Sequence, residues 1–333
     1  MKSHLCNMIK EHVLHKGVFI AMKHYIQTRL LHLIPILIGI TFLSFALMHT
    51  ASTDTVDLLY EQNGGASPAA ITAHKIALGL NKDFLGQYSD WICNILQGNM
   101  GTSFVSGQPV SSVIIEKIPS TIELMVIAVL ITLFISIPLG MITAVKKGSW
   151  IDYLIRFSAF TGNALPDFFI GLLLLYFFAV KIPIFSFFST DSNTIPILPA
   201  LTLAIAMSAK YTRQIRGILL EELHKPYIQA ARIRGIPYFY ILTHYVLRSV
   251  LSPLLALLGV SVGSLLGGAA IVESIFLWDG IGKLAVDAIV MRDYPIIQAY
   301  VIWMSLIYVL INLAVDILCC FIDPRITIHE EGH

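Results

Sequence analysis

Six long apolar stretches constrain the fold of this chain more than any other feature of its sequence. A helix that crosses the hydrocarbon of a bilayer needs about 20 consecutive, mostly apolar residues. Because a bilayer offers no water to pair with backbone polar groups, such stretches cross it as helices. We therefore predict an all-α polytopic membrane protein with six transmembrane helices, the fourth being the weakest, near residues 30–49, 120–145, 154–180, 196–215, 249–272 and 295–321.

The composition agrees with a membrane protein and gives no sign of a nucleic-acid partner. Charged residues make up 13% of the 333 residues, whereas soluble proteins contain about 25%. The formal net charge of +1 carries no information about nucleic acid by itself, and no nucleic-acid partner is predicted. The four cysteines show no metal-ligand spacing and the histidines are isolated; we therefore predict no bound metal.

The distribution of lysine and arginine predicts how the chain is oriented. Cytoplasmic segments of membrane proteins carry an excess of these two residues. If the N-terminus lies in the cytoplasm, most of the 22 lysines and arginines fall on the inner side, and every inner segment contributes to the excess. Both termini are therefore predicted to be cytoplasmic.

This orientation predicts a membrane core, two short tails and one large extracytoplasmic segment. Residues 1–21 are either a cytoplasmic extension or the result of a start placed too early, because Met22 opens a complete beginning of its own. We favour the second interpretation. The predicted parts are a cytoplasmic tail 1–29, a first transmembrane helix 30–49, an extracytoplasmic segment 50–118, a transmembrane core 119–323 and a cytoplasmic tail 324–333.

The extracytoplasmic segment has local signals for two short helices. Ser67-Pro68 is typical of a helix start and Gly79 of a helix end. A second helix is predicted from Gln87 to Leu96, with Tyr88 and Trp91 among its apolar residues at helical spacing. The segment is too short and polar for a core of its own, so we expect it to pack on the outer ends of the helices.

A long connection before the fifth apolar stretch has the turn chemistry of a folded element. Pro226 suits the first turn of a helix. "YIQAARIR" is a good helix former, Gly235 can adopt the left-handed conformation after it, and Pro237 blocks continuation. A second helix, "YFYILTHYVLR", leads into the fifth stretch. We predict a helix–Gly–helix elbow that serves as a docking surface.

Several motifs in series then resemble a known family. "QAARIRG" (229–235) is similar to the EAA-x-x-x-G signature of ATP-binding-cassette (ABC) importer permeases, and "HYVLRSVLSP" resembles the continuation of that signature in the dipeptide, oligopeptide and nickel branch. "GNMGTSFVSGQPV", "KIPSTIELMVIAVLI", "IVESIFLWDGIGKLAVDAIVMRDYPIIQAYV" and "FIDPRI" are further marks of that branch. Gln229, Ser249 and Asp279 depart from the usual glutamate, asparagine and proline. The resemblance covers about residues 22–326 and is strongest to the "B" member and to the nickel permease.

The resemblance implies a type I ABC importer (MetI-like) permease fold with a coupling loop at residues 217–248. In this family the two short helices of the loop fit a groove on a cytoplasmic ATPase. Gly235 would let the two helices meet closely, and Ala230 and Ala231 would permit tight contact with the partner. The residues implied in coupling are Gln229, Ala230, Ala231, Arg232, Arg234, Gly235 and His244.

The same resemblance implies the partners and the cellular location. They are a second permease subunit of "C" type, two cytoplasmic ABC ATPase subunits and an extracytoplasmic substrate-binding protein, at the bacterial inner membrane. No G-x-x-x-x-G-K-[ST] phosphate loop occurs in the chain. The chain is therefore predicted not to be an enzyme and to bind no cofactor, with ATP and Mg²⁺ held by the ATPase subunits.

Polar and small residues within the apolar stretches are candidates for the transport pathway. Asp167 follows Pro166 at an interruption of the third stretch and, with Asn163, either lines the cavity or packs at a kink. The small residues of the fifth stretch favour close helix packing and, in this fold, border the pathway. The pathway-lining candidates are Asn163, Asp167, Ser261, Gly263, Ser264 and Gly267.

The cargo is predicted only by resemblance. The closing "DPRITIHEEGH" and the second apolar stretch look most like nickel permeases, so we expect nickel, free or chelated, with dipeptides or oligopeptides as the alternative. A stand-alone secondary transporter or channel is the alternative of another class. It would require coupling charges near the middle of the bilayer and an inverted repeat, and the sequence offers few such charges and no visible repeat.

Overall fold

The structure is a computed structural model that describes residues 27–29, 31–50, 67–77, 82–182 and 196–322. Within these ranges the secondary structure is helical, and the only extended pairing is an isolated bridge between Thr102 and Pro109. The all-α prediction is confirmed for this part of the chain. The two predicted starts, Met1 and Met22, and the tail 324–333 lie outside the described residues.

Helices occupy all six predicted apolar stretches, but not all six are long and apolar enough to cross a membrane on their own. Four pass that test among the described residues, and a bent pair of helices makes five if it counts as one span. The four are Gln27–Thr50, α5 (Val110–Val145), Pro253–Ile275 within α11 (Leu247–Ile275), and Tyr294–Cys319 within α13 (Tyr294–Ile322). The prediction of six spans is therefore confirmed only in part.

The bent pair corresponds to the predicted third span. α6 (Trp150–Ala164) and α7 (Asp167–Leu175), which continues into the π-helix η1 (Tyr176–Lys181), meet at an angle of 103°. Leu165 and Pro166, which lie between them, have extended backbone conformations. Proline disfavours a helical conformation in the residue before it and has no N–H to donate. The predicted interruption at this proline is confirmed.

The fourth stretch, α8 (Ile197–Leu223), is a helix whose apolar character is too weak to pass the test. It packs most extensively against α5 and also contacts α6, α7 and α11. Thr202, Ser208 and Thr212 are buried in these contacts. A helix that is surrounded by other helices needs less apolar surface than one that faces lipid, which explains the weak signal in the sequence.

α5 begins earlier than predicted and is too long for the hydrocarbon alone. It starts at Val110 rather than near residue 120, and it contains Pro119 and Pro138 within 36 helical residues. At 1.5 Å per residue this helix is about 54 Å long, compared with about 30 Å for the hydrocarbon core. Residues 110–118 of the predicted extracytoplasmic segment are therefore part of the same helix as the second span.

The two predicted short helices are α3 (Pro68–Ala77) and α4 (Phe84–Leu96). α4 packs on the first spanning helix through aromatic rings: Phe45 contacts Phe84 and Tyr88 with ring centroids 5.3 and 5.5 Å apart. The hydroxyl of Tyr88 lies 3.2 Å from that of Thr41 on the same helix. α4 therefore packs on a spanning helix, but it does so along that helix, at Thr41 and Phe45, and not only at its outer end as predicted.

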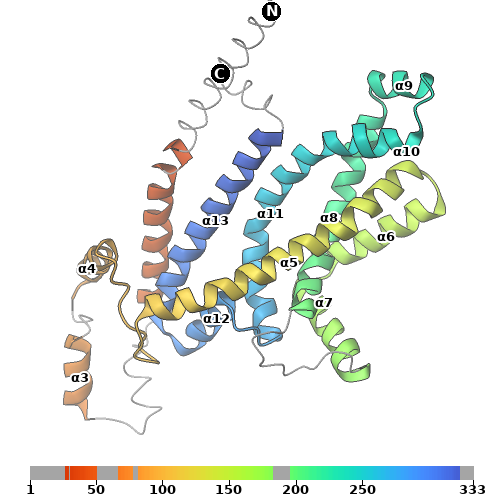
Figure 1. The fold of residues 1–333 in the computed structure, drawn as a ribbon. Helices are drawn as coiled ribbons and strands as arrows, with labels where there is room; N and C mark the ends of the chain where they lie inside the picture. The colour runs from red at the N-terminus through yellow and green to blue at the C-terminus, as the bar shows by residue number, and fades with distance from the viewer. Residues whose placement is uncertain (1–26, 30, 51–66, 78–81, 183–195, 323–333) are drawn as a thin grey trace, which may run out of the picture.

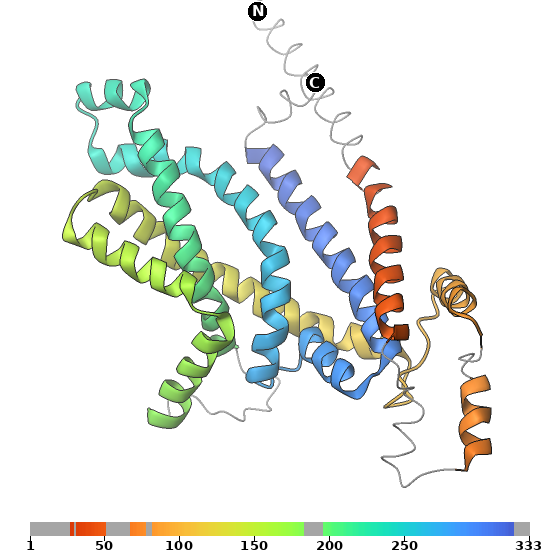
Figure 2. The same cartoon turned by 180° about the vertical axis from the view of Figure 1, so that it is seen from behind.

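The described ends of the first and last spanning helices lie at the same end of the molecule. Figure 1 shows the start of the first helix, the end of α13 and the short helix α9 (Pro226–Ile233) at this end, and Figure 2 shows the same arrangement from behind. α3 and α12 (Ile281–Met291) lie at the opposite end. An ion pair of 3.5 Å between Arg29 and Asp316 joins the first helix to α13.

A buried ion pair fixes α6 against α8. Both Asp152 oxygens accept hydrogen bonds from Arg216, from Nε and Nη2, each at 3.0 Å. Asp152 is 1% exposed, and its carboxylate also accepts from the Gly148 N–H at 3.0 Å. One carboxylate therefore holds the turn between α5 and α6 and the side of α8.

Asp152→Ala is expected to lower the free energy of unfolding by about 3–5 kcal/mol, because it leaves a partly buried guanidinium without its partner. The matched control is Asp90→Ala, which removes an exposed pair with Lys82 and should cost less than about 1 kcal/mol. Thermal unfolding of both variants in the same detergent measures the difference. Equal midpoints would contradict the structural role given to the Asp152–Arg216 pair.

Candidate functional site

The connection between α8 and α11 folds as the predicted helix–Gly–helix element, which we call the elbow (residues 224–246). Its first helix is α9, with Pro226 in the first turn. Its second is α10 (Tyr238–Tyr240), continued by the π-helix η2 (Ile241–Val246), which runs directly into α11. The elbow is thus joined to a spanning helix without an intervening loop.

Gly235 ends the first helix of the elbow in the left-handed conformation. Its φ is +76°, and its N–H donates to the carbonyl oxygen of Arg232 at 2.9 Å. Residues with a side chain rarely adopt this backbone conformation. The prediction that Gly235 takes the left-handed conformation after the helix is therefore confirmed. A Cβ at Gly235 would meet nothing within 4 Å. The expectation that this glycine allows two helices of the elbow to approach closely is therefore wrong.

Apolar side chains anchor the elbow to the end of α8. Ile228 and Ile241 are fully buried, and Ala231 is 8% exposed. They belong to the same buried cluster as Leu219 and Leu223 of α8. Of the two alanines implied in coupling, Ala231 therefore faces the interior, and only Ala230 lies on the exposed surface.

A polar joint complements this anchor. Glu222, at the end of α8, accepts hydrogen bonds from Lys225 Nζ at 2.6 Å and from the hydroxyl of Tyr227. Burial disfavours ionisation of Glu222, but the hydrogen bonds from Lys225 and Tyr227 outweigh it and lower the pKa of this carboxyl group. Burial and the hydrogen bond to Glu222 raise the pKa of Tyr227 to about 12. Glu222 is therefore ionised at neutral pH and holds the start of α9.

The exposed surface of the elbow combines apolar, aromatic and basic groups. Ile233 and Phe239 are 87% and 75% exposed, and Arg234 is also exposed. The guanidinium of Arg232 lies 4.8 Å from the centroid of the Tyr238 ring. His244 stacks on Tyr240 at 4.0 Å, and its Nδ1 lies 2.9 Å from the Thr243 hydroxyl. This is the composition of a protein-binding surface.

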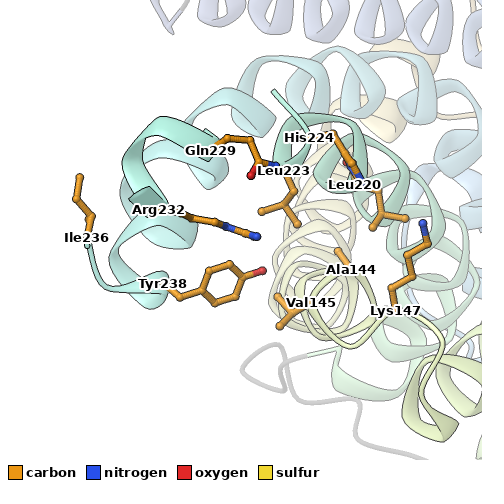
Figure 3. Close-up of a pocket in the computed structure, with 10 residues that line it drawn as sticks. All are labelled: Ala144, Val145, Lys147, Leu220, Leu223, His224, Gln229, Arg232, Ile236 and Tyr238. Carbon is orange, nitrogen blue, oxygen red and sulfur yellow. The ribbon is translucent and has the colours of Figure 1, made fainter. Parts of the chain in front are cut away.

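A cavity of about 520 Å³ lies between the elbow and the ends of α5 and α8. In Figure 3, Gln229, Arg232 and Tyr238 extend from the elbow toward the ends of those helices. Lys147, after α5, and His224, the first residue of the elbow, also line the cavity. Gln229 and Arg232, two of the residues implied in coupling, thus contribute polar groups to this cavity.

The pathway candidates come from two regions, the break between α6 and α7 and the helix α11. Asp167 is the first residue of α7, directly after the bend, and is partly buried. A Cβ at Gly268 of α11 would lie 2.9 Å from Asp167 Oδ2, so the carboxylate packs against that helix. Asn163 is exposed on α6, before the bend.

The small residues of α11 do not all share a face. Ser264 and Gly267 are exposed, as are Val260 and Ile271 at helical spacing. Gly263 is exposed at its edge, where a Cβ would lie 3.1 Å from Tyr308 of α13. Ser261 is only 2% exposed. The uncovered face of α11 therefore includes Ser264 and Gly267, and Ser261 points away from it.

Two buried carboxylates at the opposite end, Asp293 and Glu273, are polar sites that the sequence motifs did not single out. Asp293 accepts from the hydroxyl of Ser103 and from the Phe104 N–H at 3.1 Å, which joins two of the quoted motifs. Glu273 is fully buried. Asp279, the unusual residue in its motif, pairs with Lys117 at 2.5 Å. An acidic residue inside an apolar motif is a sign of a buried polar site. The sequence did not reveal the partners of these residues, because the partners are far away along the chain.

The described residues contain no group of three or more histidine, cysteine, aspartate or glutamate side chains that could hold a metal ion. The polar groups of the elbow and of α11 can form hydrogen bonds and ion pairs, but they are not grouped as the ligands of a metal ion would be. What the geometry offers is an exposed surface of apolar, aromatic and basic groups that is continuous with a spanning helix.

Comparison with known proteins agrees with this geometry. Residues 136–328 match the family described as "Binding-protein-dependent transport system inner membrane component", and residues 22–125 match the N-terminal part of such membrane components. The oligopeptide transport system permease protein AppB of Bacillus subtilis is 38% identical over 92% of this chain and 99% of its own length. The nickel import system permease protein NikB of Staphylococcus aureus is 37% identical over 89% of this chain and 90% of its own length.

Both relatives are permease proteins by name, and the two matches cover 92% and 89% of this chain. The chain is thus a non-catalytic membrane subunit, and its apolar helices are those of a multi-pass inner membrane protein. It belongs to the family of inner membrane permease subunits of binding-protein-dependent ABC importers, in the branch that includes oligopeptide and nickel permeases.

Proposed function

We propose that this permease subunit forms half of a translocation pathway and that its elbow receives movement from a cytoplasmic ATPase subunit. The observation that carries this proposal is the helix–Gly–helix elbow, which is exposed on one side and continuous with α11 on the other. A displacement of the elbow is transmitted to α11, since no loop between them can absorb it. α11 in turn carries the small residues of the candidate pathway.

The charge distribution supports a cytoplasmic location for the elbow. Lysine and arginine are concentrated on the elbow and on the segments that lie at the same end of the molecule, as expected for the cytoplasmic side. The exposed Ile233 and Phe239 would otherwise place apolar side chains in water. A groove on an ATPase subunit would cover them.

The uncovered face of α11 supports a second permease subunit as the other half of the pathway. Val260 and Ile271 are 70% and 50% exposed on that face, on either side of Ser264 and Gly267. Asp167 lies beside it, against Gly268. We propose a partner permease of "C" type across this face, two ATPase subunits at the elbow end, with ATP and Mg²⁺ bound there, and a substrate-binding protein at the opposite end.

Nickel, free or chelated, is the cargo that the resemblance of the closing segment favours. The NikB relative supports it, and the AppB relative, of nearly equal identity, supports oligopeptides as the second candidate. The described residues hold no cluster of metal ligands, so nickel would be passed on rather than stored by this part of the subunit. We propose that the binding protein selects the cargo.

Gly235→Ala is expected to reduce coupled uptake strongly, because alanine at φ +76° costs about 1–2 kcal/mol and disfavours the native turn. The matched control is Gly217→Ala in α8, where a Cβ also meets nothing within 4 Å but φ is not positive. Uptake per ATP hydrolysed by the reconstituted importer measures the effect. Normal coupling in the Gly235 variant would contradict the elbow proposal.

Ile233→Asp is expected to abolish binding of the ATPase subunits without affecting the fold, because this side chain is 87% exposed and would be desolvated only in the complex. Val290→Asp, 78% exposed on α12 at the opposite end, is the control. Co-purification of ATPase subunits with each tagged variant is the measurement. Equal recovery from both variants would show that the exposed elbow is not the ATPase contact.

The cargo proposal is tested by uptake in cells that lack this subunit and in cells to which it has been restored. Restoration is expected to increase accumulation of radioactive nickel, because a permease limits entry of the cargo that its binding protein delivers. A labelled tripeptide is measured in the same cells. Restored peptide uptake with unchanged nickel uptake would overturn the assignment in favour of peptides.

A further inference from the structure

We propose that the buried Glu273 carboxylate is a positioning group that locks the turn between α11 and α12 onto α5, so that the elbow and the opposite end of the permease move together. This inference rests on the proposed role of the elbow. It adds a second fixed point, at the other end of the same helix.

Glu273 lies in the last turn of α11, far from the elbow. α11 contains 29 residues, which corresponds to about 43 Å at 1.5 Å per residue. The elbow joins its first residue without a loop, and Glu273 precedes its last residue by less than one turn. Whatever Glu273 binds is therefore mechanically connected to the elbow through a single helix.

The carboxylate of Glu273 binds two other helices at once. Oε1 accepts from the hydroxyl of Thr121 on α5 at 2.7 Å, and Oε2 accepts from the N–H of Lys283 in the first turn of α12 at 2.9 Å. The same Thr121 hydroxyl accepts from the N–H of Ile281 at 2.9 Å. N–H groups in the first turn of a helix have no acceptor within that helix. Thr121 and Glu273 therefore supply the hydrogen-bond acceptors for the first turn of α12.

Two glycines leave the carboxylate no room to move. A Cβ at Gly280 would overlap the Glu273 carboxylate, and a Cβ at Gly282 would lie 2.6 Å from the Cα of Ala270. The start of α12 is therefore pressed directly against α11 and its carboxylate. Such close contact makes this a rigid joint rather than an adjustable one.

Neighbouring residues of the turn reinforce the attachment to α5. The indole N–H of Trp278 donates to the carbonyl oxygen of Ser120 at 3.0 Å. Asp279 pairs with Lys117 at 2.5 Å. Trp278, Asp279 and the start of α12 are thus fixed to α5 over about one turn of that helix.

A rigid joint has a functional consequence that a helix cap alone does not have. If α5, α11 and α12 are locked together, the elbow can follow the ATPase subunits only when the opposite end also rearranges. The binding protein is proposed to act at that end. Loosening the joint would let the elbow move alone, and ATP hydrolysis would then no longer depend on the binding protein.

The test compares Thr121→Val with Thr121→Ser in the complete importer, reconstituted with both permeases, the ATPase subunits and the binding protein. Valine keeps the shape of threonine but removes the hydroxyl that binds Glu273 and Ile281, whereas serine keeps it. We expect ATP hydrolysis without binding protein to rise about tenfold in Thr121→Val, since loss of a hydrogen bond to a buried carboxylate shifts a conformational equilibrium by about that factor. Thr121→Ser should behave as the unmodified protein.

Asp287→Asn is the control on α12, because its half-exposed carboxylate pairs with the Lys283 side chain and does not reach the joint. A purely structural role predicts less assembled Thr121→Val complex with an unchanged ratio of hydrolysis with and without binding protein, and that result would overturn the proposal. Failure of the proposed role of the elbow would give a different result, because the ATPase subunits would then not co-purify even with the unmodified chain.

Discussion

Backbone N–H and C=O groups find no water in the hydrocarbon of a bilayer, so each of them must be paired within the protein. Helices pair these groups along their length but not at their ends, and several buried polar side chains of this chain lie at such ends. Asp152 accepts from the N–H of Gly148 at the turn into α6. Thr121 and Glu273 accept from the first turn of α12, and Asp293 accepts from the loop before α5.

Local sequence signals predicted the elements whose shape is determined locally. Pro226 and Gly235 mark the limits of α9, and Pro166 marks the break between α6 and α7. Each acts through its own backbone geometry, which neighbouring residues cannot easily override. The long, uniformly apolar helices were predicted for a similar reason, because contact with lipid sets the character of the whole segment.

Features that depend on distant contacts could not be predicted in the same way. Glu273 and Thr121 are 152 positions apart, and Asp152 and Arg216 are 64 apart. No periodicity within one segment reveals such a pair. α8 gave a weak signal because other helices surround it, and Ala231 was expected to face a partner although packing against α8 buries it. The residues implied in coupling and in the pathway are positioned by these contacts, but their roles are still predictions.

The break between α6 and α7 has a consequence for solvation. The last carbonyl groups of α6 have no N–H donors farther along their own helix, and Pro166 removes one possible donor from the turn that follows. If the two helices cross the membrane as one span, these oxygens lie at membrane depth. Lipid tails cannot satisfy them, and irregular backbone at that depth borders either protein or water. The kink thereby marks a level at which the interior of the assembled permease must be hydrated or sealed by a polar neighbour.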